Sequence, residues 1–205
     1  ARTADEADSF VLLVGDVEEL PLTTDPTGTW ISDYAYGCIG SDPFPEMLVG
    51  RMTCPAGPNV VINATHAKTR AYMDNPPNVD SWYSDTMLVG HGQVSAHFVD
   101  TLEKVVAKNQ QYTWPQDWNR YYGTDIGGQY VSAWGALSAG PHLVYYRGHG
   151  SPRTWSEWDF NGQSQSTLDI PTFYYAQFPE RTPIFISSAC SNGGIQSNDR
   201  CWTEE

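Results

Sequence analysis

The sequence predicts an α/β fold with a central, mostly parallel sheet that is flanked by helices on both faces. Short apolar runs that end at glycine or another small residue are typical of buried parallel strands. Between them lie segments whose apolar residues recur at helical spacing. No internal repeat or low-complexity tract is visible in the 205 residues. A chain of this length can bury a sizeable core, so we expect residues 1–205 to form one domain.

The expected elements alternate along the chain. The apolar runs predict strands at residues 9–15, 47–52, 86–90, 142–147 and 183–189. Helical spacing predicts helices at residues 58–74, 94–108 and 128–138, and residues 112–118 form a weaker strand or a loop. The helix at 94–108 has the clearest apolar face, and prolines end the helix at 58–74. Residues 16–46 are rich in Pro, Gly, Asp and Thr and predict a long loop.

The composition excludes some classes of protein. The formal net charge of −13 disfavours nucleic acid as a partner, because the phosphate backbone attracts Lys and Arg. No apolar run reaches membrane-spanning length, and no signal peptide is visible. The chain starts at Ala1 rather than Met, and its end carries no stop signature. We therefore expect it to be cut at both ends.

Two of the expected strands end at residues that suit covalent catalysis. One runs Pro183-Ile-Phe-Ile-Ser-Ser-Ala-Cys190, and the other runs His142-Leu-Val-Tyr-Tyr-Arg-Gly-His149. Strands of an open α/β sheet place their chemistry beyond their carboxyl ends, so the thiol and the imidazole are expected at one edge. Cysteine hydrolases use such a pair, because the attacking species is the thiolate. Each residue alone is more often structural, but together they favour catalysis.

Other chemistries fit the sequence less well. Cys38, Cys54 and Cys201 do not end an apolar strand in a small-residue turn, so they rank below Cys190 as nucleophiles. A disulfide between Cys38 and Cys54 is left open. A serine hydrolase is disfavoured because no Gly-x-Ser-x-Gly elbow occurs. A catalytic zinc is disfavoured because His-Glu-x-x-His is absent and no two histidines lie four apart.

Several segments resemble the gingipain-type cysteine peptidases. Tyr145-Tyr-Arg-Gly-His149-Gly-Ser151 resembles the family's histidine segment, and Ser188-Ala-Cys190-Ser-Asn-Gly193 resembles its nucleophile segment. Upstream, Phe10-Val-Leu-Leu-Val-Gly-Asp16 resembles an early strand of the family. The matches span about residues 10–204 in the family's order. The resemblance implies a caspase-like fold and a secreted or cell-surface bacterial endopeptidase.

The resemblance also implies roles for individual residues. Cys190 would attack the scissile carbonyl, His149 would move the proton, and backbone N–H groups of Gly150 and Cys190 would bind the oxyanion. The family's orienting acid follows the strand that matches residues 86–90, where this chain has no Asp or Glu. Gln93 or His91 is the nearest candidate, as in a Cys-His-Asn arrangement. A pair without a third member is the alternative.

In the resembled family, the residues two before the histidine and two before the cysteine line the specificity pocket. Here these two residues are Arg147 and Ser188, and Gly148 next to Arg147 is also expected to contact the substrate. A guanidinium would repel basic substrate side chains and favour acidic or polar ones. Asp100 could supply a balancing acid. The alternative is that Arg147 turns outward and pairs with a surface acid.

The resemblance further implies a protein or peptide substrate and no cofactor for catalysis. Structural calcium is a further expectation, because the family carries it and acidic residues lie in loop-like sequence at Asp16, Glu18, Glu19, Asp25, Asp33 and Asp42. Simple solvation of the surface is the alternative. Two rival functions stay open: a non-catalytic domain of the same fold in adhesion or secretion, and a cysteine transpeptidase or ligase.

Overall fold

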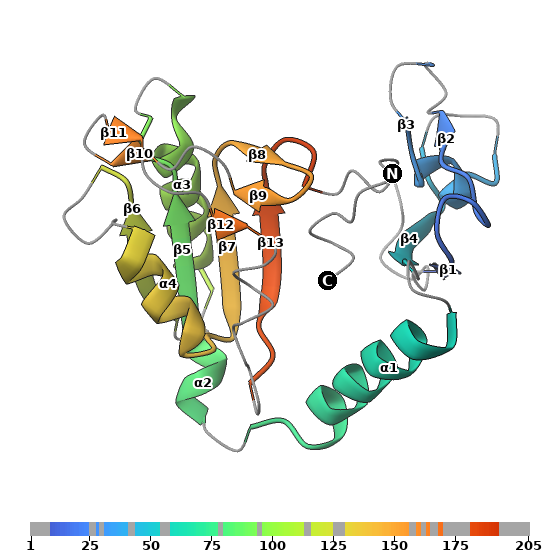
Figure 1. The fold of residues 1–205 in the computed structure, drawn as a ribbon, viewed down its shortest axis with the longest axis horizontal. Coiled ribbons are helices and arrows are strands. Elements are labelled where there is room, and N and C mark those ends of the chain that lie inside the picture. Colours follow the sequence, from blue (N-terminus) through green and yellow to red (C-terminus); the bar gives the residue numbers. More distant parts are fainter. Residues whose placement is uncertain are drawn as a thin grey trace. The chain divides into compact units, whose positions relative to one another are not determined.

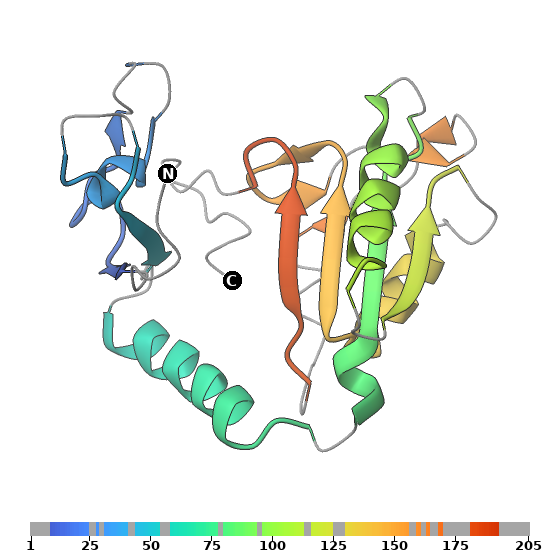
Figure 2. The same ribbon diagram turned by 180° about the vertical axis from the view of Figure 1, so that it is seen from behind.

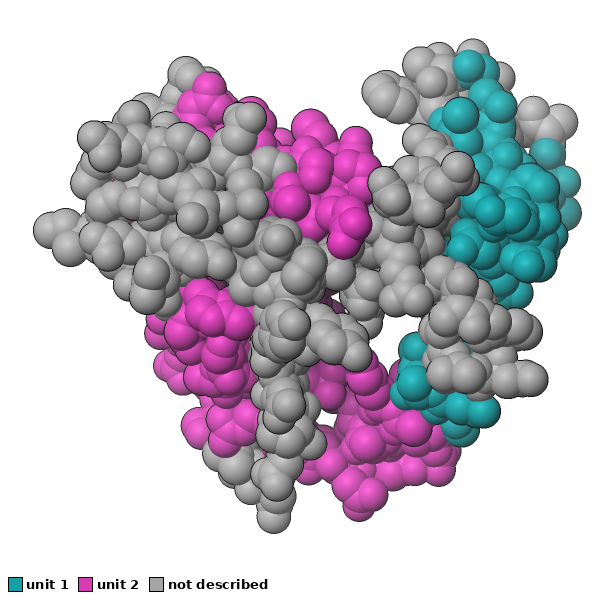
Figure 3. Space-filling view, in the orientation of Figure 1, with its two compact units in different colours: residues 1–66, 204 teal, residues 67–203, 205 magenta. Residues whose placement is uncertain are grey.

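The chain divides into two compact units, each described by itself below. Unit 1 comprises residues 1–66 and unit 2 comprises residues 67–203 (Figure 3). The computed structural model describes residues 9–24, 28, 31–40, 44–53, 58–77, 80–93, 96–112, 116–124, 130–155, 159–160, 163–164, 168–169 and 181–192.

Unit 2 is built on a parallel sheet of four strands. These are β5 (Asp85–Gly90), β6 (Asp117–Tyr122), β7 (Leu143–Arg147) and β13 (Ile184–Ser188), in the spatial order β13-β7-β5-β6. Every neighbouring pair is parallel. The chain moves from β5 to β6 on one side and then returns to β7 on the other. The strand order therefore reverses at β5, and ligands of open α/β sheets bind outside the carboxyl ends at such a point.

Helices cover both faces of this sheet, as predicted. The helix α3 (Phe98–Asn109) packs through Leu102 and Val106 against Leu88 of β5. The helix α4 (Tyr130–Ser138) packs through Leu137 against Met87. Because successive side chains of a strand point to opposite faces, residues 87 and 88 belong to different cores. Figures 1 and 2 show the two helices on opposite sides of the strands.

Short elements complete unit 2. The helix α2 (Asp80–Ser84) leads directly into β5 and was not predicted, because five residues carry no visible period. After β7, the strands β8 (Gly150–Ser151), β9 (Thr154–Trp155) and β12 (Leu168–Asp169) form a small antiparallel sheet. The strands β10 (Asp159–Phe160) and β11 (Gln163–Ser164) form a two-stranded pair.

Unit 1 contains a parallel pair of strands, β1 (Ser9–Val14) and β4 (Met47–Met52). A short antiparallel pair, β2 (Thr23–Thr24) and β3 (Ile31–Ser32), precedes the 3₁₀ helix η1 (Tyr34–Gly37). The helix α1 (Pro58–Asp74) has the predicted bounds, and it contains the boundary between the two units.

Several predictions about these elements were wrong in detail. The strand β1 is not buried on both faces: among the described residues its sheet has two strands, and Phe10 is 72% exposed. Ile184 and Ile186 of β13 are also exposed, since β13 lies at the edge of its sheet. The helix α3 begins at Phe98 rather than residue 94, because the residue before it, His97, adopts a left-handed backbone with φ 55°.

Candidate active site

The strands β7 and β13 end level with each other. Their register pairs Arg147 with Ser188, the last residue of each strand. His149 and Cys190 each lie two residues beyond that pair. The two turns touch, because a Cβ added to Gly150 would lie 2.9 Å from the carbonyl oxygen of Cys190. The two residues expected at one edge of the sheet are therefore at that edge, and Cys190 is exposed.

The turn that carries His149 is anchored in the core below it. The Tyr146 hydroxyl donates a hydrogen bond of 2.6 Å to the backbone oxygen of His149. Its ring stacks on Trp155 with centroids 4.1 Å apart. Burial raises the pKa of Tyr146, so the hydroxyl stays a donor at neutral pH. Gly148 is required here, because a Cβ would collide with the Tyr146 ring and lie 2.9 Å from Cβ of His91.

Three side chains from the end of β5 and the start of α3 surround the His149 ring. Its Nε2 lies 2.6 Å from Oε1 of Gln93. An amide oxygen only accepts, so Nε2 carries the proton and Nδ1 is left as the basic nitrogen. The His91 and Phe98 rings meet the imidazole edge to face, at centroid distances of 4.9 and 5.1 Å. The structure thus contains the predicted contact with Gln93; the orienting role of this residue stays a prediction.

His91 fixes the turn that carries Gln93. It is 3% exposed, and its backbone N–H donates to the carbonyl of Arg147 over 3.1 Å. The Gln93 backbone N–H donates to Nδ1 of His91 over 3.1 Å. A buried ring that accepts such a bond fixes the turn after β5, and that turn presents the Gln93 amide.

Asn192 joins the nucleophile turn to the hairpin that follows the histidine. This side chain is 3% exposed, and its Nδ2 donates to the backbone oxygens of Ser151 and Thr154 over 2.6 and 3.0 Å. Its Oδ1 accepts a 2.7 Å hydrogen bond from Ser187, whose Oγ in turn accepts from the Trp155 indole. Because Asn192 lies two residues after Cys190, these bonds fix the nucleophile turn.

Sequence reasoning missed Asn192 and counted Phe98 only as part of a helical face. The run Ser191-Asn-Gly-Gly194 could have signalled a turn held by an asparagine, because Asn often bonds to nearby backbone in turns. Ser191 does adopt a left-handed backbone, with φ 58°. No pattern within the sequence indicates that Phe98 would contact His149, since the two are far apart in the chain.

Arg147 turns back toward Ser188 rather than outward. Its Nη1 donates to the backbone oxygen of Ser188 over 3.0 Å and to Oγ over 2.8 Å. Its guanidinium carbon lies 5.6 Å from the centre of the Phe98 ring, within reach of a cation–π contact. Its Nε is enclosed and has no hydrogen-bond partner among the described residues. Arg147 and Ser188, which were expected to line the specificity pocket, are therefore hydrogen-bonded to each other at the carboxyl end of the sheet.

Asp100 has another partner. Its Oδ2 lies 2.8 Å from Nδ1 of His97, and both side chains are largely exposed. Glu103 is bonded to Arg120 and to the Tyr122 hydroxyl. Among the described residues, no ion pair joins Arg147 to either acid. A role for Asp100 in substrate binding stays a prediction.

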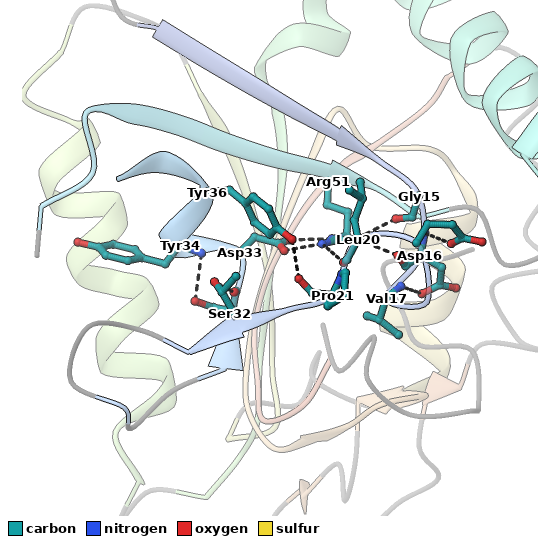
Figure 4. Close-up of polar contacts among 12 residues, drawn as sticks. Gly15, Asp16, Val17, Leu20, Pro21, Ser32, Asp33, Tyr34, Tyr36 and Arg51 are labelled. Atoms are coloured by element: carbon teal, nitrogen blue, oxygen red, sulfur yellow. Dashed lines mark hydrogen bonds and ion pairs between the residues drawn. The ribbon is translucent and has the colours of Figure 1, made fainter. Parts of the chain in front are cut away.

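The acidic loop residues of unit 1 are partly committed to internal contacts. Asp33 forms an ion pair of 2.6 Å with Nη2 of Arg51, and Asp16 accepts a bond from the backbone of Val17 (Figure 4). Within the described ranges, no three His, Cys, Asp or Glu side chains gather as a metal site. Asp25 and Asp42 lie outside the described residues, and so do Cys54 and Cys201. Structural calcium and the Cys38–Cys54 disulfide stay predictions.

The fold is similar to that of solved cysteine peptidases. The crystal structure of the Arg-specific cysteine proteinase gingipain R (RgpB) aligns with a TM-score of 0.74 at 24% identity, covering 96% of this chain and 44% of that chain. The complex of the pro- and mature domains of RgpB from Porphyromonas gingivalis gives 0.72 at 24% identity, covering 96% and 45%. A structure described only as a protease gives 0.73 at 20% identity, covering 98% and 42%. This chain thus spans less than half the length of each.

At these identities the structural likeness shows the fold, which is the α/β caspase-like architecture expected from the sequence. No curated protein sequence matches the chain. In the described part of the chain, no helix is long and apolar enough to cross a membrane. The family model "Peptidase family C25" matches residues 1–205. The chain therefore belongs to peptidase family C25, the gingipain family of cysteine peptidases.

Proposed function

We propose that this chain carries the catalytic centre of a secreted bacterial endopeptidase that cleaves peptide bonds with Cys190 and His149. The observation that carries the proposal is the level ending of β7 and β13, which brings the turns of both residues into contact. The contact of His149 with Gln93 supports it, because an orienting hydrogen bond is what a proton-transferring imidazole needs.

The reaction follows from the protonation of these groups. Nδ1 of His149 accepts the thiol proton, and the Cys190 sulfur bonds to the carbonyl carbon of the substrate. The carbonyl oxygen becomes an oxyanion, which backbone N–H groups of Gly150 and Cys190 bind. The C–N bond then breaks, and the imidazolium gives its proton to the leaving amine. Water attacks the remaining thioester, returns the thiol and releases the acid product.

Gln93 would hold the imidazole without adding a charge. An amide oxygen on Nε2 selects the tautomer whose Nδ1 is basic. A carboxylate in the same place would also stabilise the imidazolium that forms during catalysis. The proposed centre thus keeps the orienting part of a third residue and lacks its charge.

The test is peptide cleavage and thiol-directed labelling by the full chain. Cys190→Ala should abolish both, with a loss of cleavage of about a thousandfold or more. Cys38→Ala is the matched control, because it removes a thiol from unit 1, and it should leave both unchanged. Full cleavage by Cys190→Ala would assign the nucleophile to another residue. Transfer of the acyl group to an added amine in preference to water would indicate a transpeptidase or ligase.

The secreted location and the absence of a catalytic cofactor belong to the same proposal. They rest on the family, and the net charge of −13 suits a soluble exported protein. Activity in the culture medium of the source cells, unaffected by a chelator in short assays, is the expected result. A slow loss of activity in chelator that calcium reverses would reveal a structural calcium ion. Activity found only inside the cells would contradict secretion.

A further inference from the structure

The guanidinium of Arg147 is only partly satisfied by the protein. Nη1 is filled by the backbone oxygen and the hydroxyl of Ser188. Nε is enclosed and has no partner among the described residues, which costs about 1–3 kcal/mol. Nη2 also bonds to no described residue and is not an enclosed atom, so it is the donor of this guanidinium that a ligand can reach.

The described acidic residues that form ion pairs do so with other cations, so none of these pairs neutralises Arg147. Among the described residues, ion pairs join Arg51 to Asp33, Arg70 to Asp74 and Arg120 to Glu103, and His97 contacts Asp100. The face of the Phe98 ring at 5.6 Å shields one side of the cation but supplies no formal charge. A half-buried positive charge without an internal carboxylate favours a bound anion.

This charge lies directly beside the proposed catalytic pair. The Phe98 ring contacts both the Arg147 guanidinium and the His149 imidazole. Arg147 is paired in register with Ser188, and Ser188 is two residues before Cys190. A substrate whose carbonyl carbon meets Cys190 therefore brings its nearest side chain close to the guanidinium.

We propose that Arg147 selects substrates by binding a carboxylate through Nη2, so that cleavage follows an acidic residue. The inference rests on the proposed function of Cys190 and His149. A carboxylate accepts a charge-assisted hydrogen bond from Nη2, whereas a Lys or Arg side chain is repelled. Ser188 holds Nη1 and keeps the guanidinium oriented. The carboxylate comes from a side chain or from the C-terminus of the substrate, and the experiment separates these sources.

The experiment compares matched substrates on the full chain. Amidated peptides and fluorogenic peptide amides carry Asp, Asn, Glu, Gln, Ala or Lys before the cleaved bond. We expect kcat/KM for Asp or Glu to exceed that for Asn or Gln by about tenfold to a hundredfold, as for hydrogen bonds to a charged group. A second set carries neutral residues with a free or an amidated C-terminus. A preference confined to the free C-terminus would assign the carboxylate to the chain end.

Two variants test the residue. Arg147→Gln should reduce the preference for Asp over Asn to within about threefold while Asn substrates are still cleaved. Arg153→Gln is the matched control, because it removes an exposed positive charge from the turn between β8 and β9. The control should keep the preference.

The outcomes separate the inference from the proposed function. Cleavage with no preference for a carboxylate, or with a preference for Lys or Arg, overturns the inference and leaves the endopeptidase standing. A preference that survives Arg147→Gln also overturns it. Absence of any cleavage or thiol labelling by the unsubstituted chain overturns the proposed function instead. Where Arg147→Gln fails to fold, Arg147→Met serves, because it removes the positive charge and keeps an apolar stem, and it should weaken the preference in the same way.

Discussion

Two arginines at the carboxyl ends of parallel strands, Arg51 in β4 and Arg147 in β7, have opposite surroundings. The Arg51 side chain is 5% exposed, and it forms a two-point contact with Asp33 through bonds of 2.8 and 2.6 Å. Backbone oxygens of Gly15 and Leu20 accept from its remaining N–H groups at 2.9 and 2.8 Å (Figure 4). In the described part of unit 2, Ser188 is the only hydrogen-bond partner of the Arg147 side chain, and the Phe98 ring lies 5.6 Å from its guanidinium carbon.

The difference shows that a strand-end position does not by itself assign a role to an arginine. A cation whose donors are filled by an internal carboxylate and by backbone oxygens ties loops to a strand, and no ligand can displace those bonds cheaply. A cation with a donor that no described residue fills, such as Nη2 of Arg147, contributes little to the fold and remains available to a ligand. Stability measurements on the two arginines should therefore diverge.

The largest loss in the free energy of unfolding is expected for Arg51→Met. It leaves the Asp33 carboxylate and several backbone oxygens without their donor, and breaking a buried pair in this way costs about 3–5 kcal/mol. Arg147→Met is the matched variant in unit 2, with an expected change within about 1 kcal/mol, because it also removes an unpaired donor. Urea unfolding followed by hydrogen exchange in β1, β4 and β7 measures both. Equal losses in the two variants would contradict the comparison.

The second-largest loss of stability is expected for Asn192, whose side-chain amide is hydrogen-bonded near the carboxyl end of the sheet. Asn192→Ala removes two donors from the oxygens of Ser151 and Thr154, and we expect a loss of about 2–3 kcal/mol in stability. Cleavage should also slow, because the nucleophile turn loses its anchor. Asn119→Ala is the control: its one exposed bond to Asp85 should be worth less than about 1 kcal/mol. An unchanged melting temperature in Asn192→Ala would show that the anchor is not needed.

The third effect is kinetic. Gln93→Ala removes the acceptor of Nε2 of His149, and we expect kcat to fall about tenfold with little change in KM, equivalent to about 1.4 kcal/mol in the barrier. Gln93→Glu keeps an acceptor oxygen and should recover part of kcat. Gln110→Ala, at the exposed end of α3, is the control and should behave as the unsubstituted chain. A rise in KM alone would show that Gln93 binds substrate instead.

The smallest effect is expected at a third arginine, Arg120, whose pair with Glu103 is exposed. The hydrogen bond from Arg120, opposed by burial and aided by Tyr122, lowers the pKa of Glu103 below its ordinary value. A lowered pKa stabilises the fold above the unfolded value of about 4.3 and does so less as pH falls through the folded value. Glu103→Gln should therefore cost less than about 1 kcal/mol near neutral pH, and progressively less as the pH falls below about 4.3.

Unfolding by urea at several pH values measures this difference between the unsubstituted chain and Glu103→Gln. A difference that persists unchanged in acid would mean that the loss comes from packing or from the Tyr122 hydrogen bond, rather than from the charge. The ionisation of the pair would then contribute nothing measurable.

Much of the fold was predictable because local patterns carry it. The bounds of α1 are those that helical spacing and Pro76 indicate, and β5 and β7 follow their apolar runs within one residue. The start of α3 was not predictable, since a left-handed backbone such as that of His97 is uncommon even for His, which adopts it more often than most residues. The strand β6 was assigned too early, because Asp117–Tyr122 mixes polar and aromatic residues without a clear alternation.

By itself, the sequence determined which residues follow the strands: Cys190 and His149 follow apolar runs, and no acid directly follows β5. Local composition decides these facts, because buried parallel strands need continuous apolar side chains. Only the tertiary structure decided what each side chain meets. The contact of Gln93 with His149, the anchoring by Asn192 and the contact of Arg147 with Ser188 depend on register between segments that are far apart in the chain. Such long-range contacts leave no period or motif in the sequence, so they emerge only when the strands are paired.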